Sequence, residues 1–200
     1  MRTTLVLAFL LIFATYNNGI CQSRPISHDQ YLLVLDVQGA FIDHKPYEKD
    51  ARAMIASVNS ILGDFSPEKI IYVKSAGKAL SFSSWRFKTD TLPAPDFDNT
   101  LKIVSKNIFV KVSGDAFTSV DLIALLTENH AKEIVLAGLL AEECITNTAL
   151  GGMERGYNIT VIPEAITGKS EKSKEKAIRK LQEKGIKILP VNDLQINISR

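Results

Sequence analysis

Three side chains that can do chemistry together each end or follow an apolar run of the sequence. Asp36 follows the first run, Lys111 ends the third, and Cys144 lies a few residues beyond the fourth. A thiol is mostly protonated at neutral pH, but a nearby ammonium stabilises the thiolate and a carboxylate within reach can take the proton. Such a set predicts Cys144 as a nucleophile and Asp36 as a general base that later protonates a leaving amine. The alternative is a structural ion pair between Asp36 and Lys111 beside a buried cysteine.

Apolar strands and amphipathic helices alternate along the chain at the spacing of β-α-β units. This alternation predicts an α/β fold with three layers, α/β/α, and a mostly parallel central sheet of about six strands in Rossmann-like topology. Ligands bind beyond the carboxyl ends of the strands in such sheets, so Asp36, Lys111 and Cys144 are expected to meet at one edge. The predicted strands are 31–37, 69–73, 107–111, 133–138, 157–163 and 186–189, and the predicted helices are 47–62, 118–129, one around Ala149, and 170–184.

Cys144 lies where a strand gives way to a helix. Unpaired N–H groups and the positive end of the helix dipole favour a thiolate there, and the N–H groups around Leu140 and Cys144 could hold an oxyanion. A cysteine is also a common buried core residue, and that alternative stays open. Gly151 and Gly152 in the following helix predict close packing of its backbone against a neighbour.

The N-terminus has the pattern of a secretory signal peptide. Arg2 precedes a short apolar run from Leu5 to Ala14, which is too short for a permanent membrane anchor. We place the signal peptide at 1–21 and one mature domain at 22–200, which predicts a secreted or periplasmic protein without stable membrane insertion. A lipid-modified Cys21 is the alternative, and it is disfavoured because bulky Ile20 precedes the cysteine.

The composition is that of an ordinary globular domain. Hydrophobic residues make up 46% and charged residues 23% of the chain, and the formal net charge is +2. Its 200 residues suffice for one substantial core. A charge so close to neutral does not indicate a nucleic-acid partner.

The stretch from Lys74 to Thr100 has no clear hydrophobic period. A segment of this length is typical of a lid or a binding loop, although its aromatic residues could equally pack it onto the core. The residues expected to shape a substrate pocket come from this stretch and from segments after the first and third strands. They are Gln38, Phe41, Phe82, Trp85, Arg86 and Phe117.

The order and separation of these residues resemble the isochorismatase-like cysteine hydrolases over about residues 30–190. The first strand matches a hydrophobic-Asp-x-Gln-x-x-Phe pattern, the third a Lys followed by an Ala-Phe pair, and the fourth a Gly-x5-Cys pattern followed by Thr-Ala and a Gly-Tyr turn. The matching residues are Leu35, Asp36, Gln38, Phe41, Lys111, Ala116, Phe117, Gly138, Cys144, Thr148, Ala149, Gly156 and Tyr157.

The resemblance implies that Asp36, Lys111 and Cys144 are a catalytic triad. The triad would hydrolyse a C–N bond of a small amide or ureido compound through a thioester on Cys144. The resemblance also implies a cis peptide bond at Leu139–Leu140, which places the Leu140 N–H at the oxyanion site together with Cys144. It further implies self-association into a homo-oligomer. A catalytically inactive or ligand-binding member of the same fold is the alternative.

The chain departs from the nicotinamidase branch of that family. This branch holds a metal through an Asp-x-His segment and a second His after the second strand, whereas residues 74–82 contain no His. We therefore expect no catalytic metal and no cofactor. Cys144 argues against the vinyl-ether cleavage of true isochorismatases, which lack that nucleophile. A nucleotide-binding module is disfavoured because no Gly-rich fingerprint follows the first strand.

Overall fold

The computed structural model describes residues 30–83 and 86–194. Its strands are β1 (Gln30–Leu35), β2 (Ile70–Ser75), β3 (Lys78–Ser83), β4 (Arg86–Thr91), β5 (Ile108–Lys111), β6 (Glu133–Leu139), β7 (Asn158–Thr167) and β8 (Lys187–Ile188). Six of them form one sheet in the order β5-β2-β1-β6-β7-β8, and every neighbouring pair in that sheet is parallel. The prediction of a mostly parallel sheet of six strands is confirmed.

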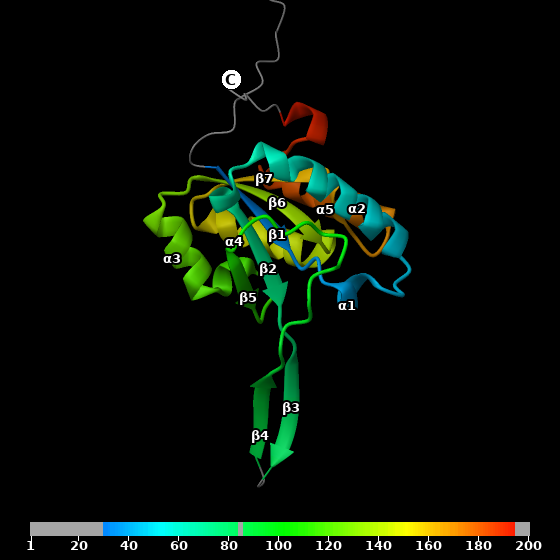
Figure 1. The fold of residues 1–200 in the computed structure, drawn as a ribbon, viewed down its shortest axis with the longest axis vertical. Helices are drawn as coiled ribbons and strands as arrows, with labels where there is room; N and C mark the ends of the chain where they lie inside the picture. The colour runs from blue at the N-terminus through cyan, green and yellow to red at the C-terminus, as the bar shows by residue number, and fades with distance from the viewer. Residues whose placement is uncertain (1–29, 84–85, 195–200) are drawn as a thin grey trace, which may run out of the picture.

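Helices cover both faces of this sheet (Figure 1). The helices are α1 (Gly39–Ile42), α2 (Glu48–Ile61), α3 (Val120–Glu128), α4 (Thr146–Glu154) and α5 (Glu171–Glu183). The core on one face contains the buried side of α2, and the core on the other face contains the buried sides of α3, α4 and α5. The three-layer α/β/α architecture therefore agrees with the prediction.

The central strand β1 shows why the sequence carries an apolar run without polar alternation. Leu32 and Val34 belong to the core under α2, whereas Leu33 and Leu35 belong to the core under α3, α4 and α5. All four side chains are fully buried. A parallel strand covered on both faces needs apolar residues at every position, and this requirement identifies β1 from the sequence alone.

The topology brings the carboxyl ends of distant strands together. The chain runs from β1 outward to β2 and β5, and then returns to add β6 on the other side of β1. The strand order reverses between β1 and β6, and ligand sites form beyond the strand ends at such a switch point. Asp36 follows β1 directly, Lys111 ends β5, and Cys144 lies just beyond β6.

Residues 74–100, predicted to lack regular structure, contain an antiparallel hairpin. β3 and β4 pair from Lys78 opposite Thr91 to Ser83 opposite Arg86, and the hairpin extends away from the α/β/α body (Figure 1). An isolated hairpin buries little apolar surface, so its strands carry only a weak apolar pattern. The prediction of an irregular loop is therefore wrong for this segment.

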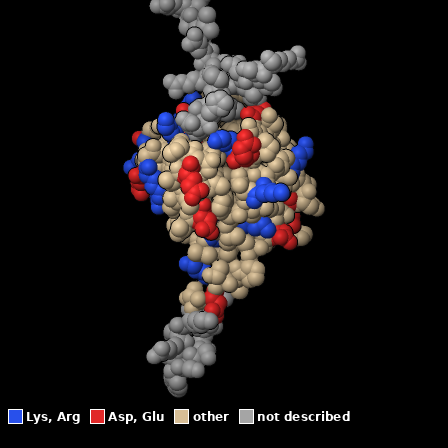
Figure 2. All heavy atoms as spheres, turned by 60° about the vertical axis from the view of Figure 1, so that its left-hand side comes forward, with Lys and Arg blue, Asp and Glu red and all other residues tan. Residues whose placement is uncertain are grey.

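Part of the sequence prediction falls on residues that the structure does not describe. The signal peptide at 1–21, Cys21 and Trp85 lie outside the described residues, as do the side chains of Phe82 and Arg86. Within the described ranges, no helix has the length and apolar character needed to cross a bilayer. The face drawn in Figure 2 carries positive and negative side chains interspersed, a pattern typical of a solvated surface.

Gly138 allows β6 to lie close to β1. Its φ is 117°, and an added Cβ would lie 2.0 Å from the carbonyl oxygen of Leu35. We expect Gly138→Ala to lower the free energy of unfolding by about 3 kcal/mol or more, because backbone overlap adds to conformational strain. Urea denaturation followed by circular dichroism measures the change.

Gly63→Ala is the matched control, because no atom lies within 4 Å of an added Cβ at that position. Its free energy of unfolding should stay within about 0.5 kcal/mol of the unmodified protein. Equal losses of stability in the two variants would contradict the role given to Gly138.

Candidate active site

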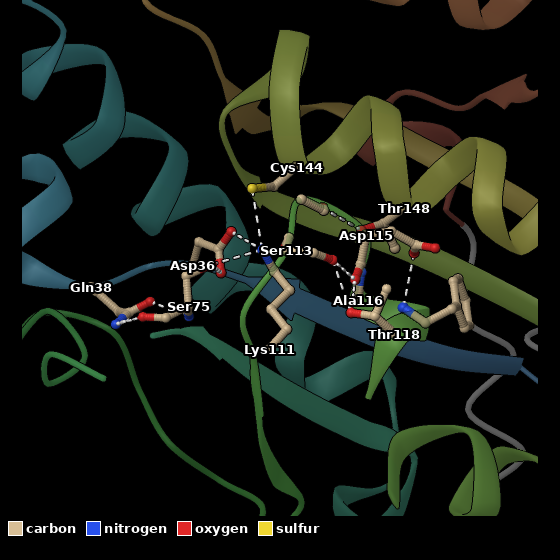
Figure 3. A network of polar contacts seen from close by, with 12 residues as sticks. Asp36, Gln38, Ser75, Lys111, Ser113, Asp115, Ala116, Thr118, Cys144 and Thr148 are labelled. Atoms are coloured by element: carbon tan, nitrogen blue, oxygen red, sulfur yellow. Dashed lines mark hydrogen bonds and ion pairs between the residues drawn. The ribbon is translucent and has the colours of Figure 1, made fainter. Parts of the chain in front are cut away.

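Asp36, Lys111 and Cys144 meet at the carboxyl ends of the strands (Figure 3). Lys111 Nζ lies 2.8 Å from Asp36 Oδ2 and 3.2 Å from Cys144 Sγ. The structure thus brings into contact three residues that the sequence separates by tens of positions. An ammonium, a carboxylate and a thiol share one site, which is the arrangement on which their predicted chemistry depends.

The ammonium of Lys111 is fully buried and fully partnered. It donates hydrogen bonds to Ser75 Oγ at 2.7 Å, to the carbonyl oxygen of Ser113 at 3.0 Å and to Cys144 Sγ at 3.2 Å. These three bonds use its three protons, so Asp36 holds it by charge. A buried ammonium requires such partners, because an isolated charge in the interior is very costly.

The two oxygens of Asp36 have different surroundings. Oδ1 accepts a hydrogen bond from the Ser75 hydroxyl at 2.8 Å, whereas Oδ2 accepts none despite its charge contact with Lys111. Oδ2 therefore keeps its capacity to accept a proton. Ser75 was not predicted as a site residue; the available signal was a polar side chain at the end of the second strand, at the same edge as the triad.

The surroundings of the Cys144 thiol favour its protonated form. Burial and the negative charge of Asp36 raise its pKa from 9.0 to about 11, although Lys111 acts in the opposite direction. Lys111 lowers the pKa of this thiol, as the sequence predicted, but burial and the charge of Asp36 outweigh that effect. Cys144 lies within a π-helical turn at Ala141–Ile145 that precedes α4, so it is not at a regular helix N-terminus.

A cis peptide bond precedes the turn that carries Cys144, and the helix α4 that follows the turn packs closely on its neighbours. The Leu139–Leu140 peptide bond is cis, as the resemblance implied. In α4, a Cβ added to Gly151 would lie 2.4 Å from Asp115 Oδ2, and one added to Gly152 would lie 2.6 Å from Ile159 Cδ1. The predicted close packing of this helix is confirmed, and it fixes the element that follows the nucleophile.

A small cavity of about 210 Å³ opens beside the thiol. Its volume suits a small molecule, and its walls combine apolar side chains with a few polar groups. The lining residues are Asp36, Phe41, Lys45, Tyr47, Ser75, Leu139, Leu140, Glu143 and Cys144. Lys45, Tyr47 and Glu143 were not predicted, because nothing in their local sequence separates a cavity wall from an ordinary surface.

The predicted pocket residues divide into two groups. Phe41 lines the cavity. Gln38 is buried and binds backbone instead: its Nε2 donates to the carbonyl oxygens of Ser75 and Pro95, and its Oε1 accepts from the Ser75 N–H. Phe117 is in the core, where its ring stacks on Tyr157 with 5.3 Å between centroids. The structure therefore places Gln38 as a support of the β2 end, and Phe117 away from the cavity.

The donor set does not fit the metal site of the nicotinamidase branch. At the end of β2, Lys74 pairs with Asp96 at 3.1 Å, and Ser75 is bonded to the triad. Residues 30–83 and 86–194 contain no group of three or more His, Cys, Asp or Glu that could hold a metal ion.

Comparison with known proteins identifies the family of this chain. The isochorismatase domain model matches residues 30–193. The chain is 24% identical over 153 residues to the secreted isochorismatase effector Isc1 of Verticillium dahliae, with 74% of this chain and 77% of that protein covered. It is 24% identical over 149 residues to streptothricin hydrolase of Streptomyces noursei, with 71% of this chain and 54% of that protein covered.

Solved structures show the same fold. An isochorismatase-like hydrolase from Alkaliphilus metalliredigens superposes with a TM-score of 0.67 at 18% sequence identity, with 82% of this chain and 95% of that chain covered. The family model spans nearly all the residues that the structure describes. The chain belongs to the isochorismatase-like hydrolase family.

Proposed function

We propose that this protein is a cysteine hydrolase that cleaves the C–N bond of a small amide or ureido compound through a thioester on Cys144. The observation that carries the proposal is the contact of a thiol, an ammonium and a carboxylate beside a cavity of about 210 Å³, which the thiol and the carboxylate line. The likeness to streptothricin hydrolase, whose name describes a hydrolytic reaction, supports it.

In the first half of the reaction, Cys144 attacks the substrate carbonyl. Asp36 takes the thiol proton as Sγ forms a bond to the carbonyl carbon, and the carbonyl electron pair moves to oxygen. Leu140 and Cys144 both line the cavity, and we assign their N–H groups to this oxyanion. The C–N bond then breaks, and Asp36 returns its proton to the leaving nitrogen.

In the second half, water releases the acyl group. Asp36 takes a proton from water, the hydroxide attacks the thioester carbonyl, and the C–S bond breaks as Cys144 regains a proton. An amide substrate yields a carboxylic acid, and a ureido compound yields a carbamic acid. Lys111 contacts both Asp36 and Sγ, so it offsets whichever of them carries the negative charge.

The raised pKa of Cys144 is compatible with this sequence of steps. A thiol that stays protonated until Asp36 removes its proton is protected from unspecific alkylation and oxidation. The same raised pKa favours the second candidate, a ligand-binding member of the fold with an inert thiol. The two candidates differ in whether a covalent adduct ever forms on Sγ.

Export is part of the proposal. The basic and apolar pattern at 1–21 is that of a signal peptide, and a relative covering 74% of this chain is described as secreted. Cys144 would then work as the sole cysteine of the mature chain, with no disulfide partner in the same molecule.

Self-association is also proposed, on the family resemblance and on one observation of the structure. The resemblance implies it, and the edge strand β5 exposes the apolar side chains Ile108 and Val110, with Val112 just beyond the strand. Apolar side chains along an open sheet edge are typical of an interface between chains.

Intact-mass spectrometry tests the hydrolase. The mature protein is mixed with a panel of small amides and ureido compounds and quenched in acid within seconds. We expect a mass increase equal to the acyl group, mapped to Cys144, together with release of ammonia or an amine. Cys144→Ala should show neither. If compounds bind but no adduct or amine release is seen with any of them, the ligand-binding candidate holds.

A further inference from the structure

We propose that the substrate carries an anionic group, such as a carboxylate, at the far end of a short carbon chain, and that Lys45 binds it at the mouth of the cavity. This inference rests on the proposed function and names the substrate class for it. The charges, the hydrogen-bond donors and the apolar side chains of the cavity support it.

The charges of the cavity leave one ammonium unmatched. Asp36 is paired with Lys111, and Glu143 is paired with Lys169, which lies outside the cavity lining. The Lys45 ammonium has no ion pair or hydrogen bond with any residue in the described ranges. The carboxylates that line the cavity are thus neutralised, and a positive charge remains at the wall.

The neutral donors of the cavity are already used. The Ser75 hydroxyl donates to Asp36 Oδ1, and the Tyr47 hydroxyl donates to the carbonyl oxygen of Phe41 at 3.0 Å. Among the described side chains that line the cavity, Lys45 therefore holds the uncommitted N–H groups. Lys45 is therefore the side chain that can donate a hydrogen bond to a polar group of the substrate that lies away from the thiol.

Part of the cavity wall is apolar. Phe41, Leu139 and Leu140 contribute hydrocarbon side chains to the lining. A bound molecule with one polar group at Cys144 and another at Lys45 can place a short run of carbon atoms against these side chains. The substrate class is therefore an amide or ureido derivative of a small carboxylic acid.

The backbone that carries Lys45 is held in place. Its N–H donates to the carbonyl oxygen of Ile42 at 3.2 Å, and its own carbonyl oxygen accepts from the Glu48 N–H at 3.0 Å. These bonds fix the turn between α1 and α2 beside the cavity. The side chain itself is exposed to solvent, so its contribution to binding is moderate and depends on ionic strength.

Three amides of nearly equal shape test the inference: glutaramate, neutral pentanamide and cationic 5-aminopentanamide. We expect the wild-type protein to prefer glutaramate over pentanamide at least about tenfold in kcat/KM. Lys45→Met should lower kcat/KM for glutaramate about tenfold, mainly through KM, and change the value for pentanamide far less. Lys45→Glu should shift the preference toward 5-aminopentanamide. Lys49→Met is the control, because that lysine is exposed on α2 outside the cavity lining.

Binding to Cys144→Ala separates this inference from the hydrolase proposal. Isothermal titration measures glutaramate and pentanamide with and without the additional Lys45→Met change. If both compounds bind equally, or the Lys45 change leaves the glutaramate Kd unaltered, the anion site is wrong whatever the turnover. If glutaramate binds through Lys45 but no amide acylates the wild-type thiol, hydrolysis is wrong and the anion site holds.

Discussion

Cys144→Ser is expected to lower kcat/KM for an accepted amide by at least about 10³-fold, with the fold intact. A serine hydroxyl is a far weaker nucleophile than a thiol, and none of the described residues that line the cavity is a histidine that could activate it. The charged groups that act on the pKa of Sγ are Asp36 and Lys111. A steady-state assay of ammonia or amine release measures the loss, and circular dichroism with a melting curve checks the fold.

Cys144→Ala is the companion variant, because it removes the nucleophile without adding a polar group. Its residual rate should equal that of Cys144→Ser, since each variant blocks formation of the same covalent intermediate. If either folded variant kept more than about a tenth of the wild-type rate, the thioester route would be refuted.

Asp36→Asn is expected to separate turnover from thiol reactivity. Loss of the general base should lower kcat/KM about 10²- to 10⁴-fold. The same change removes a negative charge that raises the Cys144 pKa to about 11, so that pKa should fall. A lower pKa raises the thiolate fraction at pH 8, and alkylation of Cys144 by iodoacetamide should become about tenfold faster or more.

The measurement compares iodoacetamide labelling rates from pH 7 to pH 11 by mass spectrometry. Asparagine tolerates the positive φ of 60° found at Asp36, so the variant keeps the backbone of this position. Asp96→Asn is the charge-matched control, because that carboxylate is exposed and paired with Lys74. A parallel fall of labelling and turnover in Asp36→Asn would contradict the charge balance described for the site.

The sequence predicted those parts of the fold in which burial dictates residue type. β1 and β6 are apolar at successive positions because both of their faces are covered, and their ends locate Asp36 and the turn with Cys144. β7 was predicted to end at Pro163 but continues to Thr167. The pairing of β6 with β7 shifts register at this point, which allows a proline inside the strand.

Side chains whose role depends on tertiary contacts were less predictable. Phe117 belongs to the matched family pattern, but its ring faces the core, and no period in the sequence gives that direction. Ser75 and Lys45 are common surface types that only the closed sheet and the α1–α2 turn bring to the cavity. The raised pKa of the thiol was not predicted, because the burial that raises it depends on packing from several segments.

Lys111 also stabilises the edge strand β5 of the sheet. It is the last residue of β5, an outermost strand, and such strands have backbone groups without a neighbour and fray readily. Its ammonium fastens that strand to Ser75 at the end of β2 and to Asp36 after β1. If the border opened, Asp36 would be left as an uncompensated carboxylate in the interior. The candidate active site therefore also stabilises the edge of the sheet. Removal of Lys111 would destabilise the pairing of β5 as well as lower activity.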